Sequence, residues 1–223
     1  MQPAIQSSIR AQMLAMRLIC LMGLLLSGCS TSNQLHSTTQ VLDINLTRHA
    51  LQASGIAFIT PTSVTGQEED KQALALAFTD ALQLARPDLR VMPLPQTLGA
   101  INGAGLANEY RQMFEDYGVS GIFSRDSLQK VSRVIGIRYL AQLKLSGFRQ
   151  EAKNRWNALG VRILETKTTS LRLYLQIWDG EDGSVAWEGS EEITSAYESV
   201  KENPISFKTA VEQAANTLVA RLP

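Results

Sequence analysis

The stretch LRLYLQIWDGEDGSVAWEGS, residues 171–190, carries the clearest structural signal in the chain. From residue 171 to residue 177 every second side chain is leucine or isoleucine, and the residues between them are mostly polar. This alternation predicts a strand with one buried face. The turn-forming residues DGEDG, 179–183, follow at once, and SVAWEGS, 184–190, returns. The stretch therefore predicts an antiparallel β-hairpin.

Two of the three tryptophans flank this turn. We expect the indoles of Trp178 and Trp187 to pack across the hairpin, because aromatic pairs stabilise neighbouring strands. Trp156 lies in a polar stretch instead. It is the candidate for an exposed contact with a ligand or a partner.

Upstream of the hairpin, the pattern predicts a helix followed by another strand. Residues 126–135 have helical spacing of apolar side chains, and Gly136 can end the helix as a C-terminal cap. Residues 138–148 alternate, with Leu143 and Leu145 on one face. The charged stretch 149–155 is expected to separate this strand from the hairpin.

The first half of the chain has the pattern of a crossover unit. Residues 55–60 and 89–94 are short apolar runs typical of buried strands, and residues 71–85 between them have helical periodicity. Two further helices are expected over residues 106–117 and 207–222. The stretch 95–105 is either a loop or a weak helix start, and residues 41–53 are either an edge strand or a short helix.

These elements predict a single α/β (α+β) domain over residues 41–223. We expect a three-layer sandwich with one mixed sheet, a C-terminal antiparallel hairpin in that sheet, and helices packed on it. The composition agrees, since the chain has 223 residues, of which 44% are hydrophobic and 19% charged.

The N-terminus has the layout of a secretory signal peptide. Arg10 and Arg17 precede the apolar run 18–26, and small residues lead to Cys29. The run is much shorter than the roughly 20 residues that cross a bilayer as a helix. Residues 1–28 are therefore expected to be a signal peptide, with Met1, Met13 and Met16 as alternative starts.

The segment Leu26-Ser27-Gly28-Cys29 resembles a bacterial lipobox. This resemblance implies that Cys29 receives a diacylglyceryl group, that cleavage occurs before it, and that its new amino group is acylated, typically with palmitate. Ser30 in place of aspartate implies sorting to the outer membrane, with the domain facing the periplasm. Residues 29–40 are then expected to be the lipidated cysteine and a flexible tether, because STSNQLHSTTQ has no charge and little apolar content.

Two segments together resemble a superfamily of envelope domains. One runs from Leu128 through Gly136 to Tyr139, and the other from Leu173 to Trp187. The superfamily includes the curli-secretion lipoprotein, the lipoprotein activators of penicillin-binding proteins, and the N-terminal domain of the Tol–Pal propeller protein. The resemblance implies the three-layer fold. The charged connection 149–170 argues against a pore like that of the curli-secretion lipoprotein, and the short tether argues against a long reach across the envelope.

Charge and composition exclude several classes of function. The chain has 21 basic and 21 acidic residues, and loss of residues 1–28, which hold two arginines and no acid, leaves a net side-chain charge of −2. This is unlike the clustered positive charge of a nucleic-acid-binding protein. The few cysteines and histidines, Cys20, Cys29, His36 and His49, give no disulfide framework and no Cys- or His-based metal site.

The sequence also offers no catalytic set. Three groups of neighbouring carboxylates lie in expected loops or turns, where solvated acids lack the environment that paired catalytic acids need: Glu68-Glu69-Asp70, Glu181-Asp182 and Glu191-Glu192. Gly99, Gly103 and Gly105 lack the Lys-Ser/Thr that a phosphate loop requires. We therefore expect no enzyme activity, no cofactor and no metal.

The sequence thus favours a lipid-anchored periplasmic lipoprotein that acts as a non-catalytic assembly or accessory module of the cell envelope. Its expected partners are the membrane, through Cys29, and an envelope protein or further copies of itself. The alternative is a lipoprotein that binds a small molecule or glycan in a cleft lined by Trp156 and the glycines of residues 95–105.

Overall fold

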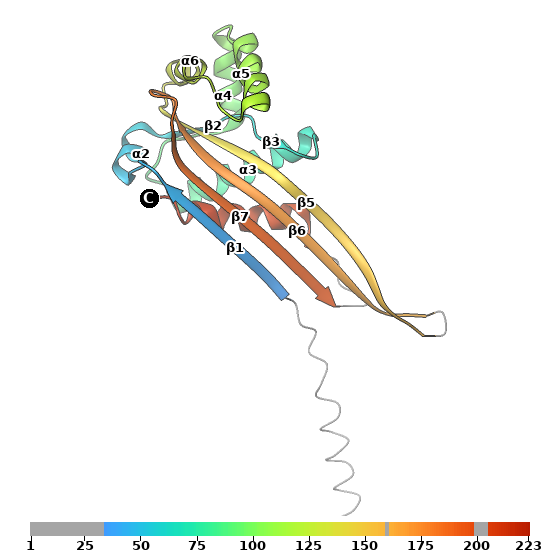
Figure 1. Ribbon diagram of the computed structural model, residues 1–223. Coiled ribbons are helices and arrows are strands. Elements are labelled where there is room, and N and C mark those ends of the chain that lie inside the picture. Colours follow the sequence, from blue (N-terminus) through green and yellow to red (C-terminus); the bar gives the residue numbers. More distant parts are fainter. Residues whose placement is uncertain (1–33, 159–160, 199–204) are drawn as a thin grey trace, which may run out of the picture.

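The computed structural model describes residues 34–158, 161–198 and 205–223 (Figure 1). Its strands are β1 (Gln34–Asp43), β2 (Ile56–Phe58), β3 (Thr62–Ser63), β4 (Val91–Met92), β5 (Tyr139–Ala158), β6 (Val161–Asp179) and β7 (Val185–Glu198). Its helices are α2 (Arg48–Ser54), α3 (Glu68–Ala85), α4 (Leu94–Gly103), α5 (Ala107–Ser120), α6 (Arg125–Ile135) and α7 (Phe207–Val219).

Over these residues the strands form one mixed sheet of seven strands. Its order is β1-β7-β6-β5-β2-β4, and β3 pairs with β5 beside this path. The pairs β2–β4, β2–β5 and β3–β5 are parallel, whereas β5, β6, β7 and β1 run antiparallel in turn. Helices pack on both faces of the sheet, so the expected α/β (α+β) sandwich with a C-terminal antiparallel hairpin is confirmed.

The two faces of the sheet have separate hydrophobic cores. On one face, α3 and α7 bury Phe78 and Leu218 against alternate residues of β6, Leu171 to Ile177. On the other, α4, α5 and α6 bury Met113 and Leu128 against Leu140 and Trp178. Figure 1 shows α4, α5 and α6 gathered at one end of the long strands, so no helix of the described residues covers the rest of this second face.

The two tryptophans of the hairpin lie on opposite faces of the sheet. Trp187 pairs with Ile177 and belongs to the core under α3 and α7, whereas Trp178 belongs to the core under α4, α5 and α6. The expectation that their indoles pack together is therefore wrong. A register shift between Ile177 and Trp178 accompanies this arrangement, and Trp178 packs edge-to-face on Phe123 instead.

An ion pair between the partly exposed Arg138 and the buried Asp179 closes the hairpin turn against the neighbouring strand. Arg138 donates two hydrogen bonds from Nε and one from Nη2 to the Asp179 carboxylate, at 3.0, 3.0 and 2.6 Å. The Asp179 side chain is buried, and its Oδ1 also accepts from the backbone N–H of Glu181. Gly183 takes a positive φ of 80° in this turn, and a Cβ there would lie 2.9 Å from Arg125. The turn residues are thus fixed by local geometry rather than by a ligand.

The helix over 126–135 is confirmed as α6, with Gly136 as its left-handed cap. The helices expected over 71–85, 106–117 and 207–222 are confirmed as α3, α5 and α7. Residues 94–103 form a helix, α4, where a loop or weak helix start was expected. The segment 41–53 contains both of its alternatives, because β1 ends at Asp43 and α2 follows from Arg48.

The polar stretch 149–155 does not separate two strands. It continues β5, and the β5–β6 hairpin extends as far as the pair Ala158–Val161. Figure 1 shows this hairpin projecting beyond the rest of the domain. The projecting part of the β5–β6 hairpin has no described helix packed on it, so its strands do not need apolar side chains on one face. The alternation of apolar residues therefore stops, although the backbone pairing of β5 with β6 continues.

The expectation of a flexible tether is wrong for residues 34–40. They belong to β1, which pairs with β7 from Gln34–Ala196 to Asp43–Trp187. Backbone pairing along an existing strand requires no apolar pattern, so the polar sequence does not prevent it. The expected signal peptide, residues 1–28, and residues 29–33 of the expected tether lie outside the described residues.

The core places a strict limit on one glycine of β7. A Cβ at Gly189 would lie 2.4 and 2.9 Å from two ring atoms of Trp187 and 3.0 Å from Leu218. We expect Gly189→Ala to lower the free energy of unfolding by about 1–3 kcal/mol, because the buried indole must move.

Gly99→Ala is the matched control. A Cβ at Gly99, within α4, meets nothing within 4 Å, so this change should raise the free energy of unfolding by about 0.5–1 kcal/mol. Urea unfolding followed by circular dichroism measures both. Equal stabilities of the two variants would contradict the tight packing at Gly189.

Candidate interaction surfaces

The structure does not bring the sequence-predicted site residues together. Cys29 lies outside the described residues. The backbone of Trp156 lies on β5 opposite Leu164, near the end of the hairpin, and its side chain is outside the described part. Gly99 and Gly103 lie in α4, at the other end of the long strands. The cleft expected from Trp156 and these glycines is therefore not formed.

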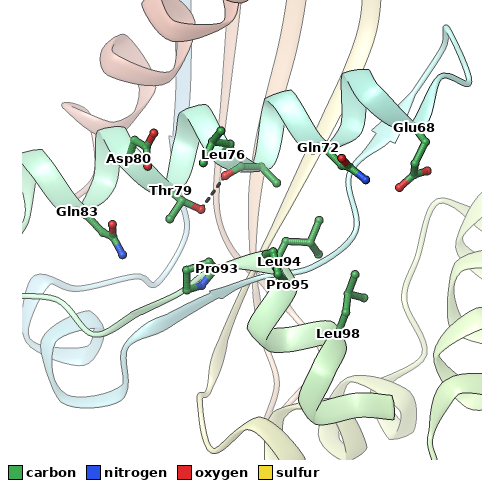
Figure 2. A pocket seen from close by; sticks show the side chains of 11 residues that line it. Glu68, Gln72, Leu76, Thr79, Asp80, Gln83, Pro93, Leu94, Pro95 and Leu98 are labelled. Carbon is green, nitrogen blue, oxygen red and sulfur yellow. Dashed lines mark hydrogen bonds between the residues drawn. The ribbon is translucent and has the colours of Figure 1, made fainter. Parts of the chain in front are cut away.

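A groove of about 560 Å³ lies between α3 and the start of α4 (Figure 2). Its apolar walls come from Ala75 on α3 and from Pro93, Leu94, Pro95 and Leu98 on the facing segment. Polar and acidic side chains of α3 line its rim, namely Glu68, Gln72, Asp80 and Gln83. Such a groove can take an apolar side chain whose neighbourhood is neutral or cationic.

The outer surface of α3 adds apolar area beside this groove. Leu76 is 63% exposed and Leu84 is 84% exposed. They stand four residues on either side of Asp80, so all three lie along one side of the helix. Leu98 of α4 is also exposed across the groove. Contiguous exposed leucines of this kind are typical of a contact surface.

The edge strand β1 is a second exposed apolar surface. Leu35, Val41 and Leu42 on β1, and Ile44 just after it, are all exposed. Strand β1 is ten residues long, and Asp43, at its end, is its only Asp, Glu, Lys or Arg residue. Natural sheets protect long edges with charges, prolines or bulges, and an edge without them invites pairing with another chain.

A buried carboxylate fastens this edge strand to the sheet. Glu191 of β7 is fully buried, and its two carboxylate oxygens accept hydrogen bonds from the hydroxyls of Ser37 and Thr39, the latter at 2.6 Å. The expectation that Glu191 and Glu192 lie in a solvated loop is therefore wrong. Both are on β7, where Glu191 lies beside Leu173 and Glu192 beside Arg172.

The helix-free half of the sheet presents rows of polar side chains to solvent. One row across β5, β6, β7 and β1 is Lys144, Tyr174, Ser190 and Gln40, and the next includes Arg172, Glu192 and Thr38. Arg172 and Glu192 form an ion pair of 2.7 Å. This open polar face could contact a hydrophilic ligand, but its cavities are shallow and small, at about 230 to 270 Å³.

The perturbed ionisable groups in the described residues serve structure. The hydrogen bonds to Asp179 raise the pKa of Arg138, and those from Arg86 and Gln52 hold the pKa of Asp88 well below its usual range. Burial raises the pKa of Tyr110 to about 12, and its hydroxyl contacts Thr60. Each of these three groups is hydrogen-bonded to a neighbouring side chain.

Two further properties concern the described residues alone. Their His, Cys, Asp and Glu side chains form no group of three or more that could hold a metal ion. None of their helices combines the length and the hydrophobicity needed to cross a bilayer.

Sequence reasoning missed both the groove and the Glu191 site. The groove was not predicted because Leu76 and Leu98 are leucines within helices. The local sequence does not distinguish a leucine that lines a groove from one that is buried in the core. Glu191 had one available signal: it continues the alternate register of Trp187 and Gly189, which would have placed it on the buried face.

The comparisons with known proteins identify a similar fold. No protein-family model and no curated protein matches the sequence. Among solved structures, the PelC dodecamer from Paraburkholderia phytofirmans is similar with a TM-score of 0.50 and 10% identity, over 84% of this chain and 97% of that chain. The lipoprotein GNA1162 from Neisseria meningitidis gives a TM-score of 0.40 and 14% identity, over 75% of this chain and 98% of that chain. The first likeness shows a shared fold, and the superfamily resemblance drawn from the sequence is not confirmed.

The hydroxyls that hold Glu191 are open to a direct test. In the double variant Ser37→Ala, Thr39→Val the buried carboxylate loses both partners, and we expect the free energy of unfolding to fall by about 3 kcal/mol. Amide hydrogen exchange in β1 should become faster than in the rest of the sheet.

Thr38→Val is the matched control on the same strand. Its side chain is exposed and its hydroxyl contacts only His36, at 3.4 Å. We expect its stability to change by no more than about 0.5 kcal/mol. If the double variant exchanges its β1 amides no faster than Thr38→Val does, Glu191 does not fasten the strand.

Proposed function

We propose that this protein is a non-catalytic, lipid-anchored assembly module of the bacterial cell envelope, which acts through protein contacts and associates with further copies of itself. The observation that carries the proposal is the edge strand β1, with its exposed residues Leu35, Val41, Leu42 and Ile44. A secreted domain that leaves a long edge and several large apolar side chains uncovered requires a partner to cover them.

The proposed anchor lies close to this surface in the chain. Cys29 precedes Gln34, the first residue of β1, by five positions. Five residues span at most about 18 Å when fully extended. A lipid on Cys29 would therefore hold the start of β1 near the membrane, and copies anchored in one membrane would meet with their edges at similar heights.

Self-association has independent support from the similar fold. The structure of PelC from Paraburkholderia phytofirmans is that of a dodecamer. A domain of this fold can therefore assemble with further copies of itself. We propose the same tendency for this chain, sorted to the outer membrane through Cys29 and facing the periplasm.

Trp156 is proposed as a partner contact at a separate place. Its position near the end of the projecting β5–β6 hairpin keeps it far from the covered faces of the sheet (Figure 1). An exposed hairpin end is a suitable place for such a contact.

Binding of a glycan or small molecule is the second candidate. The open polar face favours it, because Tyr174 lies there among Lys144, Arg172 and several hydroxyls. Chemical-shift changes of these residues on titration with soluble oligosaccharides, in the absence of any self-association, would favour this candidate over the first.

The lipid anchor gives the first test. Mass spectrometry of the N-terminal peptide should show a chain that begins at Cys29 with a thioether-linked diacylglyceryl group and an acylated amine. Cys29→Ser should move the protein from the membrane pellet to the soluble fraction, because the acyl chains supply the attachment. An unmodified Cys29 in a chain that still carries residues 1–28 would contradict the anchor.

The edge surface gives the second test. In crosslinked envelopes, and by mass photometry of the detergent-extracted full chain, the wild type should form oligomers. Leu42→Lys with Ile44→Lys should reduce the oligomer about tenfold or more, because two charges enter an apolar contact.

Val119→Lys controls for the added charge, since Val119 on α5 is 93% exposed and lies away from β1. It should leave the oligomer unchanged. A wild-type chain that stays monomeric in both measurements, with no protein crosslinked to it, would refute the assembly role.

A further inference from the structure

Two exposed apolar surfaces of this chain remain without a partner, and they differ in shape. The first is the groove between α3 and α4 with the adjoining leucines of α3. The second is the segment Leu42–Arg48, which we call the β1–α2 corner. It carries Leu42 and Ile44, exposed by 60% and 52%. One surface is concave and the other projects from an edge of the sheet.

The corner is held rigidly in place. The backbone N–H groups of Ile44, Asn45 and Leu46 all donate to the carbonyl of Ala186, at 3.2, 3.1 and 3.2 Å. Leu46 is buried beneath the corner, and Thr47 caps α2 by accepting from the N–H of Ala50. A rigid projection loses little conformational entropy on docking, which favours a specific contact.

The charges of the two surfaces are complementary. Arg48, at the β1–α2 corner, is exposed and makes no ion pair within the described part of the chain. Asp80, between Leu76 and Leu84 on the outer side of α3, is also exposed and also makes no ion pair there. The other charges around the groove are already paired, Glu68 with Lys71 and Glu212 with Lys208. Two other titratable side chains lie at or beside the corner, Asp43 and the exposed His49. Asp43 points to the opposite side of β1 from Leu42, because successive strand residues alternate.

We infer that the groove between α3 and α4 binds the β1–α2 corner of a second copy of this chain. Leu42 and Ile44 enter the groove beside Leu76 and Leu98, and Arg48 pairs with Asp80. This inference rests on the self-association proposed above and adds the surface that receives the edge. A second copy is the occupant because the same chain supplies a projection with the matching apolar side chains and the matching unpaired cation.

The contact is head-to-tail, because corner and groove are different surfaces of one chain. Each added copy therefore leaves one free corner and one free groove until the assembly closes on itself. In Figure 1 the corner lies at the β1 edge of the sheet and α3 lies behind the sheet, so the two surfaces of one copy face different directions. Such a contact forms a ring where the rotation between neighbouring copies closes, and an open filament where it does not.

Charge reversal tests the pairing in the full, detergent-extracted chain by mass photometry. Asp80→Lys and Arg48→Asp should each weaken self-association about tenfold. The double variant Asp80→Lys, Arg48→Asp should restore it to within about threefold of the wild type, because the pair is re-formed with opposite signs. Circular dichroism confirms that each variant is folded.

Matched controls reverse charges that lie elsewhere. Glu69→Lys is on α3 but outside the groove, and Lys130→Asp is on the exposed side of α6; neither residue forms an ion pair among the described residues. Both should leave the oligomer unchanged, which supports a specific role for Asp80 and Arg48.

Mixing tests the head-to-tail geometry. Leu98→Glu disables the groove and Ile44→Glu disables the corner, so each variant alone should be monomeric. A mixture of the two should form 1:1 dimers and nothing larger, because only one intact corner and one intact groove remain. Absence of these dimers would overturn the inference.

The outcomes separate this inference from the proposed function. If Leu42→Lys with Ile44→Lys disrupts the oligomer but reversal at Asp80 does not, the corner acts and another surface receives it, which overturns the inference alone. If the wild type is monomeric and Asp80→Lys instead weakens crosslinking to a different envelope protein, the occupant is not a second copy. That result also refutes self-association.

Discussion

The alternation of β6 is the constraint on which the rest of the fold depends. Leu171, Leu173, Leu175 and Ile177 point to one face, so this face must be covered along its length, and α3 and α7 cover it. The residues between them are polar except at the end, where Trp178 points to the other face. Helices are needed there only over a short distance. The division into a fully covered face and a partly open one follows from a single strand.

Different interactions stabilise the two ends of the long strands β5 and β6. Near the hairpin turn, Arg138 and Asp179 join β5 to the turn with a charge-assisted contact, and α4, α5 and α6 pack on the sheet at this end (Figure 1). Toward the other end, the backbone pairing of β5 with β6 continues as far as the pair Ala158–Val161. The sheet is therefore packed between helices near the hairpin turn and continues by strand pairing where it projects.

The sequence predicted those elements whose burial is uniform along a face. The hairpin around residues 179–183, the capped helix α6 and the crossover from β2 through α3 to β4 all have this property. It did not predict β1 or the second half of β5, because Gln34–Gln40 and Arg149–Ala158 form strands by pairing with a neighbour that is already extended. It also misplaced Trp178 and Glu191. The register shift beside Trp178 and the hydroxyls that satisfy Glu191 depend on strands distant in sequence, which local patterns do not contain. Of the candidate site residues, Cys29 and the side chain of Trp156 lie outside the described part, and the groove between α3 and α4 arises only when two helices meet.

Strand β1 has features that a strand does not need merely to complete the sheet. A solitary domain could protect its edge with a lysine or a proline at little cost in stability. This edge has neither, although a buried carboxylate and two hydroxyls are used to fix it to the sheet. A strand that only completed the fold would not need exposed Leu42 and Ile44 at a corner fixed by three hydrogen bonds to one carbonyl. An edge that is both fixed in position and apolar presents a defined surface to another chain, and this combination supports the proposed assembly role.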